Sequence, residues 1–193
     1  CYGMNDGIYH PFSEDRFSAY QEGIQSIIEK VAATGTPLVL MTPPPFDPEP
    51  LRASGKLKPA GEKEYAWFEI YENYDTEVIA RYAEWILTLK DRVAATIDLR
   101  SPVLDYTAAK RKEDSSFTLS NDGVHLNAEG HHVLARKILS ALQRDPTVLD
   151  SIEPGEYARL QKQQKRMHDA WLSHVGHPRP EMKPGLPLGI ARQ

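Results

Sequence analysis

Residues 37–41, Pro-Leu-Val-Leu-Met, form a short continuous apolar run, and three prolines follow at positions 43–45. An apolar run without alternation is typical of a strand that is buried on both faces of a parallel sheet. The prolines cannot donate to a ladder of strand hydrogen bonds, so the strand should end near Met41. The sequence therefore predicts a buried parallel strand at residues 37–41.

The segments on either side of this strand have the period of amphipathic helices. Ser13 is a suitable helix N-cap, and two acidic residues, at positions 14 and 15, follow it. Gly35 should end this first helix. Its expected apolar stripe consists of Phe17, Tyr20, Ile24, Ile27 and Val31. A second helix is expected from about residue 76, with a stripe made of Ile79, Tyr82, Ile86, Leu89 and Val93.

A second apolar strand is expected at residues 94–99, after the second helix. Strands that alternate with helices of this length indicate a parallel sheet covered by helices. The predicted fold class is therefore α/β, a three-layer α/β/α sandwich with a parallel sheet.

The remaining segments are less regular. Residues 42–75 are rich in proline and lack a sustained period, so we expect a long excursion of a kind that is usually functional or poorly ordered. A polar loop should cover residues 110–116, and Asn127 should cap a helix that follows it. Another helix should begin near residue 154, whereas the glycines and prolines of residues 176–189 argue against regular structure.

This pattern divides the chain into two parts. Residues 1–150 form one partial α/β domain, and residues 151–193 form a C-terminal helix with a Pro- and Gly-rich extension. We expect the extension either to pack on the domain as a strap or to lead to a further domain beyond Gln193.

Composition excludes several classes of protein. The 23 basic and 27 acidic residues give a net charge of −4, so there is no chain-wide positive field to recruit nucleic acid. Cys1 is the single cysteine, which excludes an internal disulfide framework and a thiolate-rich metal site. No apolar run approaches the roughly 20 residues needed to span a bilayer. The sequence does not determine the cellular compartment. A secreted or periplasmic location is compatible with it, because the region of a secretory signal is not covered.

Two polar motifs lie where predicted strands end. Residues 1–7 read Cys-Tyr-Gly-Met-Asn-Asp-Gly, and residues 121–131 read Asn-Asp-Gly-Val-His-Leu-Asn-Ala-Glu-Gly-His. Sites in open α/β sheets lie beyond the carboxyl ends of the strands, so both motifs should meet in one crevice. Asp122 can accept a hydrogen bond from one ring nitrogen of His125 while the other nitrogen faces a nucleophile. Each motif alone is also an ordinary turn sequence, and only their combination favours a site.

Together the motifs resemble two sequence blocks of the SGNH or GDSL family of ester hydrolases. The resemblance covers residues 2–142 and implies a flavodoxin-like sandwich that is truncated at its N-terminus. It implies that Asn5 donates its amide to the oxyanion and that Gly3 lets the acyl group approach. It also implies that His125 is the catalytic base and that Asp122 orients it. The nucleophilic serine of the family belongs to an upstream Gly-Asp-Ser motif, which this sequence lacks.

The resemblance implies hydrolysis of a carboxylic ester by the intact protein, with a small-molecule or acylated carbohydrate substrate and no metal or organic cofactor. These 193 residues by themselves should hydrolyse no ester, because they lack the nucleophile. Aromatic residues of the proline-rich excursion either pack on the domain or stack on a sugar. They are Trp67, Phe68, Tyr71 and Tyr74.

Two other classes of function remain as alternatives. One is a non-catalytic binding module that keeps the fold without the nucleophile. The other is a metal-dependent hydrolase built on Asp122 and His125 together with His131 or His132. Adjacent histidines point in different directions on a helix, so both cannot join one cluster. His10 either lines the site or lies on the surface.

Overall fold

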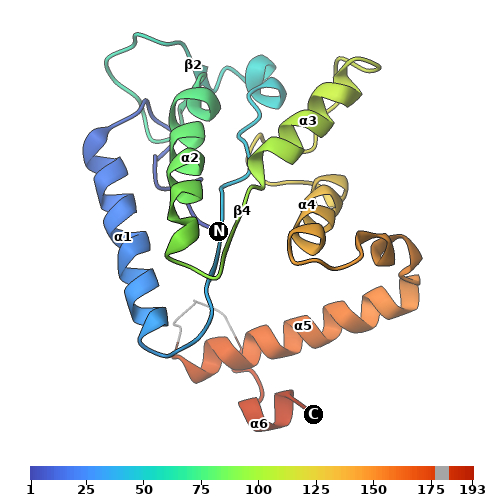
Figure 1. Ribbon diagram of the computed structural model, residues 1–193. Coiled ribbons are helices and arrows are strands. Elements are labelled where there is room, and N and C mark those ends of the chain that lie inside the picture. Colours follow the sequence, from blue (N-terminus) through green and yellow to red (C-terminus); the bar gives the residue numbers. More distant parts are fainter. Residues whose placement is uncertain (177–182) are drawn as a thin grey trace. The chain divides into compact units, whose positions relative to one another are not determined.

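The computed structural model describes residues 1–176 and 183–193, and the chain divides into two compact units, Cys1–Pro146 and Thr147–Gln193. The first unit contains helices and parallel strands, and the predicted α/β class is confirmed (Figure 1). Its main elements are α1 (Glu14–Ala32), β1 (Val39–Met41), α2 (Ala80–Thr88), β4 (Ala95–Ile97), α3 (Arg100–Arg111) and α4 (Ala128–Ala141). Its shorter elements are η1 (Glu49–Ser54), β2 (Leu57–Lys58), β3 (Ile70–Tyr71), η2 (Tyr74–Ile79) and η3 (Leu89–Asp91).

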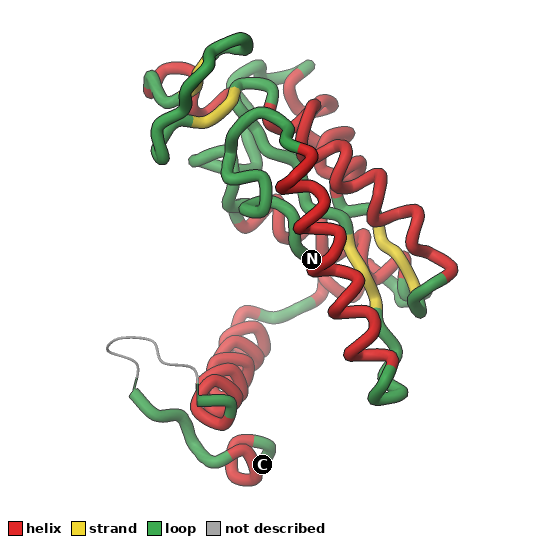
Figure 2. The backbone as a smooth tube through the Cα atoms, turned by 90° about the vertical axis from the view of Figure 1, so that its left-hand side faces the viewer, coloured by secondary structure: helices red, strands yellow, loops and turns green. Residues whose placement is uncertain are grey.

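Strands β1 and β4 form a parallel pair in which Leu40 lies opposite Thr96. Helices α1 and α2 lie on one side of this pair, and α3 and α4 lie on the other (Figures 1 and 2). This arrangement is the layering that the sequence predicts, although each sheet in the described part of the chain has two strands. The second parallel pair, β2 with β3, belongs to the proline-rich excursion.

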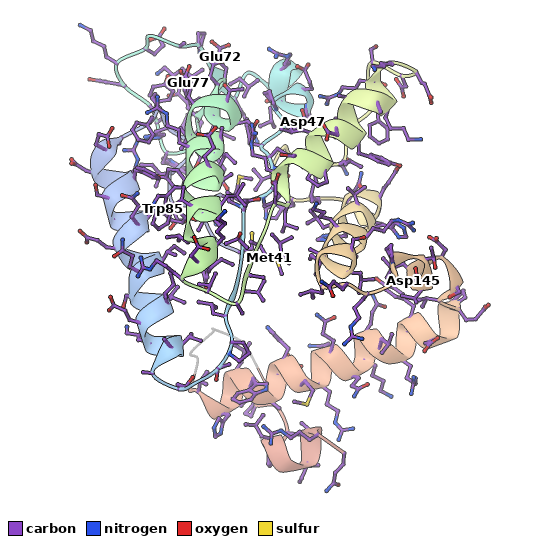
Figure 3. All side chains as sticks on the ribbon, in the orientation of Figure 1. Met41, Asp47, Glu72, Glu77, Trp85 and Asp145 are labelled. Atoms are coloured by element: carbon purple, nitrogen blue, oxygen red, sulfur yellow. The ribbon has the colours of Figure 1, made fainter. Side chains whose placement is uncertain are left out.

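The core of the first unit lies between α1, α2 and β1. Ser13 caps α1, because its side chain accepts a hydrogen bond from the backbone N–H of Arg16. The Tyr20 ring stacks on the Tyr82 ring at 4.6 Å, and Trp85 packs edge-on against Tyr20. Figure 3 labels Trp85, which belongs to α2. The buried residues of α1 follow one i, i+4 row: Tyr20, Ile24 and Ile28. Phe17 and Ile27 of the predicted stripe are half-buried and pack against this core, and Val31 at the end of the stripe is half-buried as well.

A buried threonine joins the carboxyl ends of the two central strands. Thr42 follows β1, and its hydroxyl accepts a hydrogen bond from the backbone N–H of Leu99 at 2.8 Å. The same hydroxyl donates to the carboxylate of Asp98, just beyond β4. Because both strand ends are tied together, the loops that follow them start from a fixed edge of the sheet.

Two expectations about local structure were wrong. Helix α3 occupies residues for which no helix was expected, because Pro102 sits in its first turn, where a missing N–H costs nothing. The Asp98 carboxylate accepts from the backbone N–H groups of Arg100 and Ser101 and stabilises this helix start. Secondly, the first motif was expected to follow a strand that ends at Cys1 and Tyr2, but these two residues form no strand. Cys1 Sγ instead donates a hydrogen bond to the carbonyl of Thr42, just after β1.

Element η4 (Pro146–Ser151) spans the boundary between the two units, and the second unit contains α5 (Pro154–His174) and α6 (Leu188–Ala191). Helix α5 begins where the sequence predicts, at Pro154. Part of the segment expected to be irregular, residues 177–182, lies outside the described residues. The end of that segment is helical, because the prolines stop at Pro187 and the residues after it are free to form α6. No helix of the described chain is long and apolar enough to cross a membrane.

Candidate active site

The loop between α3 and α4 holds Asp122 and His125 in a tight, internally bonded turn. Ser120 and Leu126 form an isolated antiparallel bridge that closes the loop. Asn127 then caps α4, because its side chain accepts from the backbone N–H of Gly130 at 3.0 Å. The same side chain donates to the Thr118 carbonyl, so helix start and loop start are tied together.

The Asp122 carboxylate is the centre of this turn. Its Oδ1 accepts from the backbone N–H groups of Val124 and His125 and from the Ser120 hydroxyl, at 2.9, 2.8 and 3.1 Å. Its Oδ2 lies 2.7 Å from Nδ1 of His125. Partial burial alone would raise the pKa of Asp122, but the hydrogen bonds from His125, Val124 and Ser120 hold that pKa well below its ordinary range. Asp122 is therefore ionised and fixes the orientation of the imidazole.

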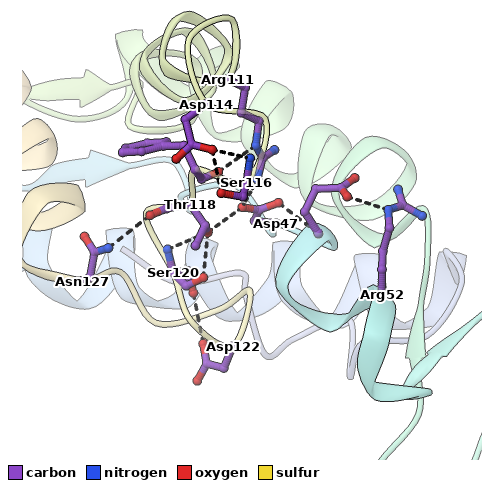
Figure 4. Close-up of polar contacts among 11 residues, drawn as sticks. Asp47, Arg52, Arg111, Asp114, Ser116, Thr118, Ser120, Asp122 and Asn127 are labelled. Atoms are coloured by element: carbon purple, nitrogen blue, oxygen red, sulfur yellow. Dashed lines mark hydrogen bonds and ion pairs between the residues drawn. The ribbon is translucent and has the colours of Figure 1, made fainter.

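This loop is docked on the segment that follows β1. The Gly123 carbonyl accepts from the Asp47 N–H at 2.9 Å, and Gly123 has a φ of 78°, in the left-handed region. A Cβ at position 123 would lie 2.4 Å from the Asp47 carbonyl oxygen, so only glycine fits. The Asp47 carboxylate in turn binds Arg111 at 2.7 Å and the Thr118 hydroxyl at 2.9 Å (Figure 4). Asp47 thus connects the end of β1, the end of α3 and the loop.

The N-terminal motif forms a second loop against the same segment. A Cβ on Gly3 would lie 3.0 Å from Cγ of Pro43, so the two residues are in close contact. The Gly3 N–H donates to the Asp6 carboxylate at 2.9 Å, which occupies this donor and orders the loop. The Asn5 side chain is exposed, and its Oδ1 accepts from the Tyr9 hydroxyl.

The structure therefore brings the predicted residues to one edge. Gly3 contacts Pro43 and Gly123 contacts Asp47, so both loops lie on residues 43–47 at the carboxyl end of β1. The two loops also interact electrostatically: burial raises the pKa of Tyr9, and the negative charge of Asp122 raises it further.

None of the serines for which hydrogen bonds are described contacts the His125 ring. Ser120 is buried and its hydroxyl donates to Asp122, whereas Ser116 donates to Asp114. Ser101 is the second residue of α3 and donates its backbone N–H to Asp98. The described loop thus holds His125 against Asp122, and the hydrogen bonds of these serines go to other groups.

The remaining candidates separate into buried and exposed groups. Tyr71 and Tyr74 are core residues, whereas Trp67 and Phe68 are 91% and 55% exposed. The His10 ring packs against the Tyr65 ring at 5.2 Å. Among the described residues, no three His, Cys, Asp or Glu side chains gather in a way that could hold a metal ion.

A cavity of about 290 Å³ adjoins the loop. Its lining includes the bridge residues Ser120 and Leu126, and the apolar side chains of Phe46 and Leu104. The charged groups on its wall include Asp47 and Arg111, which neutralise each other. Sequence reasoning missed this ion pair, because its members lie 64 positions apart and no local pattern relates them.

The sequence profile of the GDSL-like lipase/acylhydrolase family matches residues 2–138. The chain belongs to this family. The matched range contains the predicted pair, Asp122 and His125, and the predicted oxyanion residues, Gly3 and Asn5. No curated protein matches the sequence significantly.

One solved structure, a gut microbial diltiazem-metabolizing enzyme, is similar to the GDSL-like chain with 22% identity and a TM-score of 0.50. The match covers 74% of this chain and 31% of that one, so the chain spans about a third of the enzyme's length. At this identity the likeness supports the fold alone.

Proposed function

We propose that the protein is a carboxylic ester hydrolase in which His125 is the general base, Asp122 orients it and Asn5 stabilises the oxyanion. The single observation that carries the proposal is the 2.7 Å contact between His125 Nδ1 and Asp122 Oδ2. This contact occupies one ring nitrogen and leaves Nε2 free to accept a proton from a nucleophile. Both side chains are exposed, so a substrate can reach them.

The chemistry follows the order of acyl transfer. A serine hydroxyl attacks the ester carbonyl while His125 Nε2 takes its proton, and Asp122 stabilises the imidazolium. The carbonyl oxygen gains negative charge in this step and accepts a hydrogen bond from the Asn5 amide. The alcohol then leaves with the proton of His125, and water repeats the sequence to release the acid. Because the Gly3 N–H is bound to Asp6, the role of Gly3 is to leave room for the acyl group.

The nucleophile is proposed to lie upstream of Cys1, in a Gly-Asp-Ser motif of the kind that gives the family its name. We propose an acylated carbohydrate or another small-molecule ester as the substrate, and no cofactor. The exposed aromatic pair of Trp67 and Phe68 supports a sugar, because such rings stack on its apolar face.

A serine-directed fluorophosphonate tests this function. We expect it to label one serine upstream of Cys1 in a longer chain, and to leave the 193-residue chain unlabelled. Lack of labelling and of p-nitrophenyl acetate turnover in the longer chain would instead support a non-catalytic binding module. Loss of turnover on EDTA treatment, with recovery on added zinc, would support the metal-dependent alternative.

A further inference from the structure

We propose that Tyr9 is a positioning residue that orients the Asn5 side chain as an oxyanion donor, an inference that rests on the ester hydrolysis proposed above. Asn5 is exposed, and an exposed primary amide can turn either of its ends toward a substrate. Only the NH2 end stabilises a developing negative charge, whereas the oxygen end would repel it. A device that selects one orientation therefore contributes directly to the chemical step.

The contact between the two residues makes this selection. The Tyr9 hydroxyl donates its proton to Oδ1 of Asn5, four positions earlier in the same loop. Because Oδ1 of Asn5 already accepts this hydrogen bond, the NH2 group of Asn5 is the end that can face the substrate. No hydrogen bond from Nδ2 of Asn5 to another described residue competes with that use.

Tyr9 is held firmly enough to act on Asn5. Its carbonyl oxygen accepts from the backbone N–H of Tyr71 at 2.8 Å, which ties the loop to β3. Its ring lies 5.2 Å from the ring of Tyr74, which is fully buried. The Tyr74 hydroxyl donates to the carbonyl of Met4 at 2.7 Å, so one core residue supports both ends of the Asn5 turn.

The backbone conformation of this turn is costly. Ile8 and Tyr9 have φ values of 52° and 60°, in the left-handed region that side chains with a Cβ rarely adopt. A conformation of this kind persists only where the surrounding contacts impose it. Here the left-handed backbone at Ile8 and Tyr9 turns the chain back, so that the Tyr9 hydroxyl reaches Oδ1 of Asn5.

Electrostatics keeps the phenol in its donor form. Burial raises the pKa of Tyr9 and the Asp122 carboxylate raises it further, so the hydroxyl stays protonated across the neutral range. The same interaction shows that the tyrosine lies within the field of the acid that orients His125.

Tyr9→Phe isolates the hydroxyl, because the ring contact with Tyr74 and the backbone bond from Tyr71 do not need it. Tyr106→Phe is the matched control. Tyr106 is also half-buried, and its hydroxyl donates at 2.6 Å to the carboxylate of Glu129 in the first turn of α4, not to Asn5.

The first measurement needs no activity and uses the 193-residue chain. Relaxation of the Asn5 side-chain 15N amide should show an ordered group in the parent protein and in Tyr106→Phe, and increased motion in Tyr9→Phe. An Asn5 amide that is equally ordered in all three proteins would overturn the proposal.

The second measurement uses a longer, serine-containing chain and p-nitrophenyl acetate. Tyr9→Phe should lower kcat by about 3- to 10-fold with little change in KM, as the loss of one hydrogen bond predicts. Asn5→Ala should cost on the order of 10²–10³-fold, and adding Tyr9→Phe to it should cost nothing more. An equal loss from Tyr9→Phe in both backgrounds would contradict the proposal. An inactive longer chain would refute the proposed function, while the amide relaxation would still decide whether Tyr9 orients Asn5.

Discussion

The backbone N–H of Asp47 donates a hydrogen bond to the carbonyl oxygen of Gly123 across 2.9 Å. This bond attaches the loop of the predicted base to the segment that follows β1, far from it in sequence. Asp47 is itself bound by Arg111, so strand, helix and loop share one polar junction (Figure 4). The geometry of Asp122 and His125 depends on this junction as much as on their own spacing.

Gly123→Ala should disrupt the loop. The new Cβ would lie 2.4 Å from the Asp47 carbonyl oxygen, and the left-handed φ of 78° adds strain of about 1–3 kcal/mol. We expect a lower urea midpoint and loss of esterase activity in a serine-containing chain. Gly23→Ala is the control, because Gly23 lies within α1 with no atom near its Cβ position and should gain about 0.5–1 kcal/mol. Equal stability of the two variants would contradict the described packing.

Asp122→Asn should change how stability depends on pH. The folded pKa of Asp122 lies below the unfolded value of about 3.9, so its carboxylate stabilises the fold fully above that value. This contribution is lost as the pH falls through the folded pKa. The stability difference between parent and variant, measured by urea unfolding, should therefore be constant from pH 7 to 5 and decrease between pH 4 and 2. Asp105→Asn, at an exposed position of α3, is the control. A difference that is as large at pH 2 as at pH 7 would show that the charge of Asp122 is not responsible.

Arg100→Met should lower the stability of the fold, because it leaves the buried Asp75 carboxylate without its ion-pair partner. Asp75 is buried and accepts from the Phe46 N–H, and Arg100 forms an ion pair with it. Burial raises the pKa of Asp75, and Arg100 opposes that rise. Without Arg100 we expect a loss of roughly 3 kcal/mol at pH 7, because an unpaired carboxylate stays buried.

The pH dependence of this loss has the opposite sign to that of Asp122. A carboxyl whose folded pKa is raised destabilises the fold above that pKa and ceases to do so when it is protonated. The deficit of Arg100→Met should therefore be smaller at pH 4 than at pH 7. Arg52→Met, which breaks the exposed pair with Glu49, should cost less than about 1 kcal/mol. A deficit that is independent of pH would indicate lost packing instead.

Trp67→Ala should change substrate binding without changing the stability of the fold. The side chain is 91% exposed, so the free energy of unfolding should change by less than about 0.5 kcal/mol. If Trp67 stacks on a sugar, KM for an acetylated oligosaccharide should rise while KM for p-nitrophenyl acetate is unchanged. Equal effects on both substrates, or on neither, would argue against a carbohydrate substrate. Tyr157→Ala, at an exposed aromatic of the second unit, is the control.

Local sequence patterns predicted the elements that are marked by their own residues, namely by a helix cap or by a continuous apolar run. The capped helices α1 and α4 and the apolar strands β1 and β4 lie close to the expected residues. Helix α3 was missed, because a Ser-Pro pair reads as a break unless the Asp98 cap before it is considered. The positions of Asp47 and Tyr9 could not be predicted, since their contacts with Arg111 and Tyr71 join segments that only the folded chain brings together.

The kinetics of His125→Ala in a serine-containing chain test the central claim most directly. His125 is exposed and its side-chain contact is with Asp122, so its removal should leave the urea midpoint nearly unchanged. We predict that kcat/KM for p-nitrophenyl acetate falls on the order of 10⁴-fold or more, as expected for loss of the base in a unit that acts together. A variant that keeps its activity within tenfold of the parent would contradict the assignment of Asp122 and His125 as the catalytic pair.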